Sequence, residues 1–133
     1  MNADHSLFHT LYYSAAVVGL NTSAQLEAGI VGRPVYTLLQ DEFVDGQQGT
    51  LHFKYLLKEN GGFVDVAPDF EGHRRQLAAA VGGEYDRDAI RRFTERFLRP
   101  SGLDRPATPI MVKAIERFAV DCATRSGGEA AAS

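Results

Sequence analysis

Short runs of apolar residues alternate along the chain with helical patterns, and small polar loops separate them. Over residues 4–13 the apolar side chains fall on one face of a helix. An apolar run over residues 16–20 predicts a buried strand, and the capping-box spacing at Thr22 predicts that a helix begins there. Gly32 is expected to end this helix, and a second apolar run over residues 35–39 predicts the next strand.

The alternation continues after a polar segment over residues 40–50, which is predicted to be a loop. A short helix is predicted over residues 51–59. A third strand is predicted over residues 63–67, where apolar and polar residues alternate. The remaining patterns predict three helices: one over residues 69–81, one that Asp86 caps and that has Ile90, Phe93 and Phe97 on one face, and one over residues 108–124 with a continuous apolar stripe.

Strands that alternate with helices predict an α/β fold. We expect a small, parallel, Rossmann-like sheet of about three strands, with flanking helices and a C-terminal helical segment. One domain is predicted over residues 1–125, and the small polar tail over 126–133 is predicted to be disordered. Three strands are few for a sheet that is buried on both faces. The chain is therefore expected either to be part of a larger protein or to dimerise.

Composition and charge narrow the classes of partner. The 133 residues are 44% hydrophobic and carry a net charge of −3, so no general attraction to nucleic acid or anionic lipid is expected. No apolar run approaches the roughly 20 residues of a membrane span. The polar first residues argue against a signal peptide, and the single cysteine, Cys122, fits a reducing compartment, so a cytoplasmic location is predicted. No metal site and no cofactor are predicted.

The loop that follows the first predicted strand is a candidate phosphate site. Asn21, Thr22 and Ser23 stand where a helix begins, and free backbone N–H groups and the helix dipole favour an anion there. The alternative is plain capping, since these residue types cap helices without any ligand. Glu27 lies one turn after Ser23, roughly 6 Å away on the same face, which suits ribose hydroxyls beside a diphosphate. A solvated helix glutamate is the alternative.

The polar segment after the second predicted strand is a second candidate. It follows the carboxyl end of a strand, where open α/β sheets bind ligands. Gly46, Gln47, Gly49 and Thr50 are predicted to contact substrate, and Thr50 stands at a helix start. His52 is the candidate general acid or base. A solvated connection is the alternative for the loop, and a packing residue is the alternative for His52.

The segment LYYSAAVVGLNTSAQLEAGIVGRPVYTLL, residues 11–39, resembles the C-terminal half of GT-B-fold glycosyltransferases. Epimerases acting on UDP-N-acetylglucosamine and polyol-phosphate transferases share this layout. The loop departs from the family pattern, because Leu-Asn-Thr-Ser replaces a Gly-Ser-Gly or Gly-Ser-Ser run. The resemblance implies that Thr22 and Ser23 contact donor phosphate and that Glu27 contacts ribose. The implied ligand is a nucleotide-activated sugar or polyol, and the acceptor base would lie in a separate N-terminal domain.

Two functions from different classes follow from these patterns. The first is the donor-binding half of a glycosyltransferase-like protein, which alone would be incomplete for catalysis. With a second domain it would transfer a hexosyl or polyol-phosphate group. The second is a non-enzymatic α/β interaction domain that forms a homodimer or docks on a partner, through an exposed sheet edge or the terminal helices.

Overall fold

A computed structural model describes residues 3–43, 45–47 and 49–130 of the chain. Its contacts divide the chain into two compact units, the first ending at Pro100 and the second beginning at Ser101. The single domain predicted over residues 1–125 includes the division between the two units, and its end at residue 125 stays a prediction. Two residues of the predicted loop over 40–50, Val44 and Gln48, lie outside the described residues.

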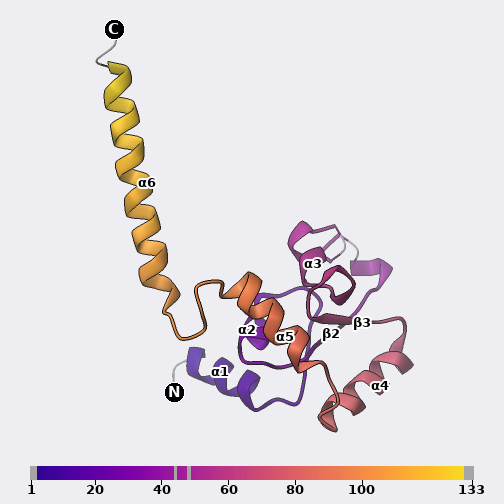
Figure 1. Ribbon diagram of the computed structural model, residues 1–133. Helices are drawn as coiled ribbons and strands as arrows, with labels where there is room; N and C mark the ends of the chain where they lie inside the picture. The colour runs from indigo at the N-terminus through magenta and orange to yellow at the C-terminus, as the bar shows by residue number, and fades with distance from the viewer. Residues whose placement is uncertain (1–2, 44, 48, 131–133) are drawn as a thin grey trace. The chain divides into compact units, whose positions relative to one another are not determined.

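The first unit is an α/β structure, as predicted (Figure 1). Its elements, in chain order, are α1 (Ala3–Tyr13), β1 (Val17–Val18), α2 (Ser23–Ile30), β2 (Val35–Leu38), the 3-10 turn η1 (Asp41–Phe43), α3 (Leu51–Leu56), the 3-10 turn η2 (Lys58–Asn60), β3 (Val64–Ala67), α4 (Phe70–Val81), α5 (Arg87–Phe93) and the π-helical turn η3 (Thr94–Leu98). The second unit holds α6 (Ala107–Ala130), which continues beyond its predicted end near residue 124.

The three strands form one parallel sheet in the order β1-β2-β3, which confirms the predicted small parallel sheet. Val35 of β2 pairs with Val64 of β3, and both belong to the core that includes helices α2 and α5. The next pair, Tyr36 and Asp65, lines a cavity with Gln76 of α4. Because successive strand side chains point to opposite faces, α4 covers one face of the sheet and α2 and α5 cover the other.

The hydrophobic core lies on the α2 and α5 side of the sheet. Phe53 of α3, Val35 and Val64 have no exposed surface, and the rings of Phe63 and Phe93 pack at a tilt with centroids 5.3 Å apart. Full burial of side chains of this size contributes about 1.5–3 kcal/mol each. This core fixes β2 and β3, and with them the loops that follow their carboxyl ends.

Gly32 ends α2 as the sequence predicts. Its φ of +74° is left-handed, which glycine adopts without the steric cost of a Cβ. The N–H of Arg33 donates to the carbonyl of Ala28 at 2.8 Å, and the N–H of Gly32 donates to that of Gly29 at 3.0 Å. These bonds satisfy carbonyls at the helix end and turn the chain into β2.

The helix predicted over residues 51–59 is shorter than expected. α3 ends at Leu56, and Leu57 takes an extended conformation with φ −68° and ψ 137°. The cause is a contact with the next strand, because Leu57 forms a parallel bridge with Val64 at the start of β3. The chain then makes the turn η2, and Gly62 donates back to the carbonyl of Leu57 at 2.9 Å.

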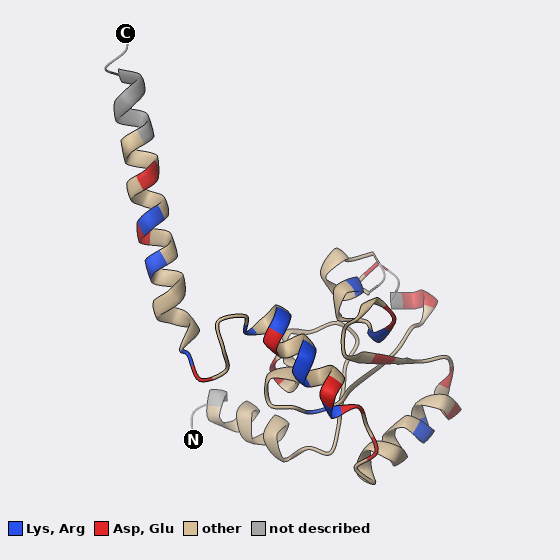
Figure 2. Ribbon diagram, viewed as in Figure 1, with Lys and Arg blue, Asp and Glu red and all other residues tan. Residues whose placement is uncertain are grey.

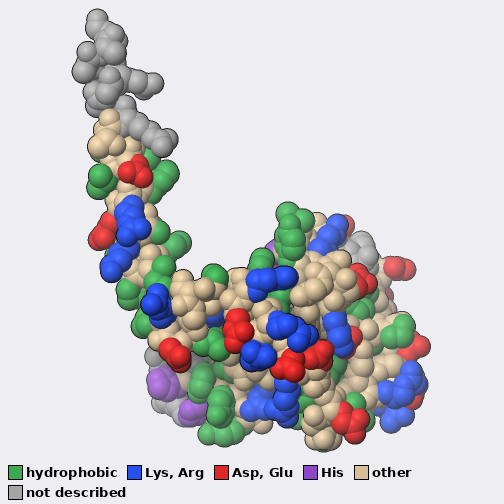
Figure 3. Space-filling model, in the orientation of Figure 1, with side chains coloured by type: hydrophobic (Ala, Val, Ile, Leu, Met, Phe, Trp, Pro, Cys, Tyr) green, Lys and Arg blue, Asp and Glu red, His purple; other side chains and the backbone are tan. Residues whose placement is uncertain are grey.

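Basic side chains follow α5 and η3, and exposed apolar side chains follow α6. Figure 2 shows Lys and Arg along α5 and η3, where Arg87, Arg91, Arg92 and Arg96 lie. Figure 3 shows hydrophobic side chains along α6, of which Phe118 is 70% exposed. The stripe predicted for residues 108–124 therefore lies on a helix with exposed apolar side chains.

Candidate functional site

The carboxyl ends of the three parallel strands meet at one edge of the sheet. Three segments leave from there: residues 19–22 after β1, residues 39–50 after β2, and Pro68 and Asp69 after β3. Open α/β sheets bind ligands at this edge. The two segments chosen from the sequence are the first two of these three.

Asn21 joins the two predicted loops. Its Nδ2 donates to the carbonyl oxygen of Gly46 at 2.7 Å and to Oγ1 of Thr50 at 3.1 Å. The bond to Thr50 is partly buried, whereas the bond to Gly46 is exposed to water. The structure therefore places Asn21, Gly46 and Thr50 together, although 25 and 29 residues separate the first from the other two.

Gln47 lies inside the loop and not on its surface. It is 1% exposed, and its Nε2 donates to three acceptors: the carbonyl of Leu20 at 3.0 Å, Oγ1 of Thr37 at 3.2 Å and the carbonyl of Leu38 at 3.1 Å. Its Oε1 is buried without a hydrogen-bond partner among the described residues. The amide of Gln47 thus fastens the second loop to the ends of β1 and β2.

Thr50 and Gly49 are also fixed by local geometry. Thr50 Oγ1 donates to the carbonyl of Gln47 at 2.9 Å, in addition to accepting from Asn21. A Cβ on Gly49 would lie 2.9 Å from the carbonyl oxygen of Asp45, closer than side chains approach backbone. The hydroxyl of Thr50 is therefore engaged within the loop, and Gly49 is needed for the tight turn before it.

Gln25 holds the first loop from the other side, a role that the sequence reasoning missed beyond its capping spacing. It has no exposed surface. Its Oε1 accepts from the N–H of Thr22 at 3.3 Å, and its Nε2 donates to the carbonyl of Gly19 at 3.1 Å. A buried glutamine three residues after a cap residue was the available signal. Thr22 and Ser23 remain exposed at the rim of this loop.

Glu27 and His52 lie near the joined loops but are not bonded to them. Glu27 is half-buried one turn after Ser23, and His52 is exposed in the first turn of α3. Within the described part of the chain, neither side chain makes a hydrogen bond or ion pair. Glu27 is thus a carboxylate with its acceptors available, and no protein group orients the His52 ring for proton transfer.

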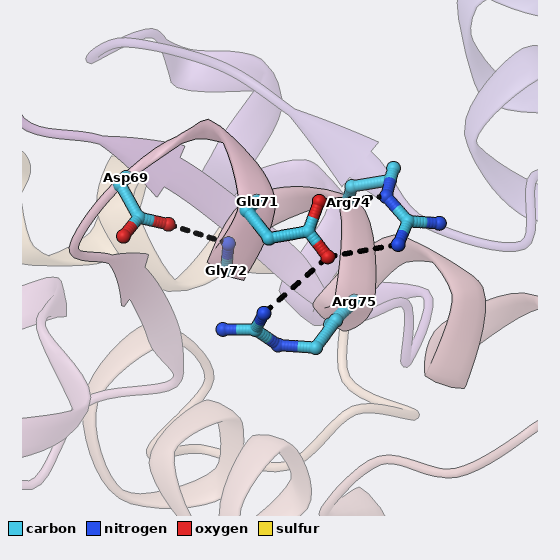
Figure 4. Close-up of polar contacts among 5 residues, drawn as sticks. All are labelled: Asp69, Glu71, Gly72, Arg74 and Arg75. Carbon is cyan, nitrogen blue, oxygen red and sulfur yellow. Dashed lines mark hydrogen bonds and ion pairs between the residues drawn. The ribbon is translucent and has the colours of Figure 1, made fainter.

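The helix that follows β3, α4, has carboxylates at its N-terminus (Figure 4). Asp69 caps α4 and accepts from the N–H of Gly72 at 2.6 Å. Glu71 in the first turn pairs with Arg74 at 2.8 Å and Arg75 at 3.4 Å. The hydrogen bond from Arg74 lowers the pKa of Glu71 below its ordinary value. The N-terminus of α4 is therefore already occupied by carboxylates.

The first turn of α2 carries no acidic residue. Its cap is the neutral Thr22, followed by Ser23, so the positive end of the helix dipole faces solvent without a protein anion. Of the helices α2 and α4, which both begin at this edge, α2 is the one chemically suited to an external anion.

No known protein family, no curated protein and no solved structure gives a significant match to this chain. Among the described residues, no group of three or more His, Cys, Asp or Glu side chains is arranged to hold a metal ion. The helices of this described part also include none with the length and hydropathy that crossing a bilayer requires.

Proposed function

We propose that the chain binds a nucleotide-activated sugar or polyol at the carboxyl edge of its sheet, as the donor-binding half of a GT-B-like transferase. The observation that supports this most is the pair of hydrogen bonds from Asn21 to Gly46 and Thr50. They hold two loops together beside the acid-free N-terminus of α2. A site for an extended ligand needs both loops, and neither alone would enclose one.

In this proposal two parts of α2 bind different parts of the ligand. The diphosphate would accept from backbone N–H groups at Ser23, which have no partner within a helix. The ribose hydroxyls would donate to Glu27, roughly 6 Å further along the same helical face. Glu27 makes no bond within the described protein, so its carboxylate can accept these hydroxyls without breaking an internal contact.

Catalysis in this proposal is mainly electrostatic. The oriented N–H groups and dipole of α2 would stabilise the charge that develops on the leaving diphosphate. His52 is the proposed general acid or base, oriented only when substrate is bound, because it is exposed in the protein alone. The base that activates the acceptor would lie in a separate N-terminal domain. A cytoplasmic location, where nucleotide-activated donors are made, belongs to the same proposal.

Calorimetric titration with UDP, CDP and their sugar or glycerol conjugates tests the proposal. We expect one of them to bind, and Glu27→Gln to weaken it about tenfold or more, since hydrogen bonds to a charged group contribute about 1.5–3 kcal/mol. Glu71→Gln is the matched control, because it removes a carboxylate from the first turn of α4 instead. No binding at millimolar concentration, or equal weakening by both variants, would contradict the proposal.

A second function, self-association, is favoured by the surface of α6. Met111, Ile115, Phe118 and Cys122 follow the 4-3-4 spacing of a coiled-coil seam, and the first three are 58–70% exposed. The helix has 24 residues and is about 36 Å long. We propose that a second copy of α6 covers this stripe, since charges of both signs flank it and do not oppose pairing of identical helices.

Light scattering under reducing conditions measures this association without a disulfide contribution from Cys122. We expect a dimer for the chain and a monomer for the double variant Ile115→Lys with Phe118→Lys. Thr124→Lys places a lysine on the polar side of the helix instead and is expected to stay dimeric. A monomeric wild-type chain, or dissociation by Thr124→Lys alone, would rule out this seam.

A further inference from the structure

A second cavity opens at the amino edge of the sheet, opposite to the candidate donor site. It has a volume of about 680 Å³, within the ordinary range for small-molecule sites, and lies between the turn before β3 and the helix formed by α5 and η3. We call it the arginine pocket. Its wall includes Lys58, Gly61, Gly62, Arg92, Phe93 and Arg96.

Most charged groups of this wall already have partners inside the protein. Lys58 pairs with Asp65 at 3.0 Å, Glu95 pairs with Arg91 at 3.7 Å, and Asp86 accepts from the N–H of Ala89 at 2.8 Å. Arg92 and Arg96 are different. Within the described residues, neither guanidinium makes a hydrogen bond or ion pair. Two unpaired cations thus face the same cavity.

A buried hydrogen bond to α2 fixes the position of the helix that carries these arginines. Thr94 is 2% exposed, and its Oγ1 donates to the carbonyl of Gly29 in α2 at 3.1 Å. The chain widens into the π turn η3 at this point, closed by the N–H of Arg99 donating to the carbonyl of Thr94 at 2.7 Å. With Phe93 and Thr94 fixed in the core, Arg92 and Arg96 are left on the pocket side.

The opposite wall is formed by Gly61 and Gly62, which have no side chains, so a ligand can approach their backbone closely. Gly61 has a φ of +82°, and a Cβ added to it would lie 3.8 Å from Nη2 of Arg96. The N–H groups of Gly61 and Gly62 already donate to the carbonyls of Lys58 and Leu57. The turn therefore supplies space, and the arginines supply the donors for a ligand.

We infer that the arginine pocket binds the oxyanion of a small ligand, a carboxylate or a phosphate group. Guanidinium groups bind such anions through paired, charge-assisted hydrogen bonds. The net charge of −3 provides no general attraction for anions, so binding there would come from the local arrangement of Arg92 and Arg96. This site is separate from the proposed donor site, since it lies before β3 and not after the strands.

NMR titration of the ¹⁵N-labelled chain tests this inference, with sodium phosphate and with succinate at constant ionic strength. We expect at least one anion to give saturable shifts at Gly61, Gly62 and the Nε–Hε groups of Arg92 and Arg96. Phosphate alone would assign a phosphate-bearing ligand, and succinate alone a carboxylate. Failure of both anions to saturate at millimolar concentration would overturn the inference.

Variants distinguish specific binding in the arginine pocket from a general effect of positive charge on anion binding. Arg92→Gln and Arg96→Gln are each expected to weaken binding about tenfold or more, by loss of a charge-assisted bond. Arg75→Gln removes the same charge from α4 and is expected to leave the titration unchanged. Equal weakening by Arg75→Gln would contradict the inference. Thermal melting checks that the variants fold, which their exposed positions lead us to expect.

Discussion

Replacing Gln47 tests whether its buried amide fastens the candidate site. Gln47→Met keeps the length of the side chain but removes the donor that serves the three acceptors around Nε2. It also removes Oε1, which is buried without a partner among the described residues. An acceptor left unpaired costs about 1–3 kcal/mol, and the loss of the unpartnered Oε1 offsets part of this. We expect a net destabilisation of about 1–3 kcal/mol.

Gln47→Glu makes a sharper perturbation at the same position. At neutral pH it places a carboxylate where three acceptors converge, and a buried charge without a partner costs about 3–5 kcal/mol. Burial and these acceptors raise the pKa of the new carboxyl above its ordinary value. Folding therefore favours the protonated form, which can donate one hydrogen bond. The destabilisation should be small below the unfolded pKa, about 4.3, and grow as the pH rises.

Urea unfolding at pH 7 and about pH 4 measures both effects, each variant being compared with wild type at the same pH. Far-UV circular dichroism is the signal, since the chain has no tryptophan. We expect the Glu variant to be less stable than the Met variant at pH 7, and this difference to shrink at about pH 4. Equal losses at pH 7, or a Glu variant whose loss does not depend on pH, would show that the amide is open to water and does not fasten the loop.

Three further predictions concern the frame of the fold. Gly62→Ala should destabilise the protein by about 3 kcal/mol or more in urea unfolding, because its Cβ would lie 2.1 Å from the carbonyl oxygen of Leu56. Gly83→Ala should cost only about 1–2 kcal/mol, because Gly83 has a φ of +82° but open space around it. Burial, and next the negative charge of Asp65, raise the pKa of Tyr36. The contribution of this shift to stability is therefore complete below about pH 10 and is lost as the pH rises. Tyr36→Phe should flatten the alkaline limb of a profile of melting temperature against pH, and an unchanged limb would refute this. Thr94→Val should cost only about 0.5–1.5 kcal/mol in urea unfolding, because the carbonyl of Gly29 keeps its bond from Gly32, and a loss well above this would mean that the π turn depends on the hydroxyl.

The elements that the sequence predicts well are those set by local signals. Residues 35–39 form an apolar run that follows a glycine and a proline, and β2 lies within it. The element bounds that the sequence does not predict depend on contacts between different elements. The end of α3 depends on the bridge from Leu57 to Val64, and the π turn coincides with the bond from Thr94 to Gly29, which is 65 residues away. Neither contact is readable from neighbouring residues.

In the candidate site, the sequence likewise predicts where the loops lie but not where each side chain points. Strand ends and turn residues locate both loops correctly at the carboxyl edge, because parallel strands must end together there. Polar composition does not distinguish a side chain that faces a ligand from one that faces the interior. Gln47 is predicted to contact substrate, and within the protein its amide donates to Leu20, Thr37 and Leu38. Which of the predicted residues contact a ligand stays a prediction.

Two buried glutamines act on neighbouring carbonyls of the same loop. Gln25 donates to the carbonyl of Gly19 and Gln47 donates to that of Leu20, so the chain entering α2 is fixed from both sides. Burying two amides is costly unless their bonds are made, and a loop that only connected β1 to α2 would not need them. A rigid loop does benefit a binding site, because donors held in place lose little entropy when a ligand arrives. The buried amides therefore favour a loop that presents Thr22 and Ser23 to a ligand over one that merely caps a helix.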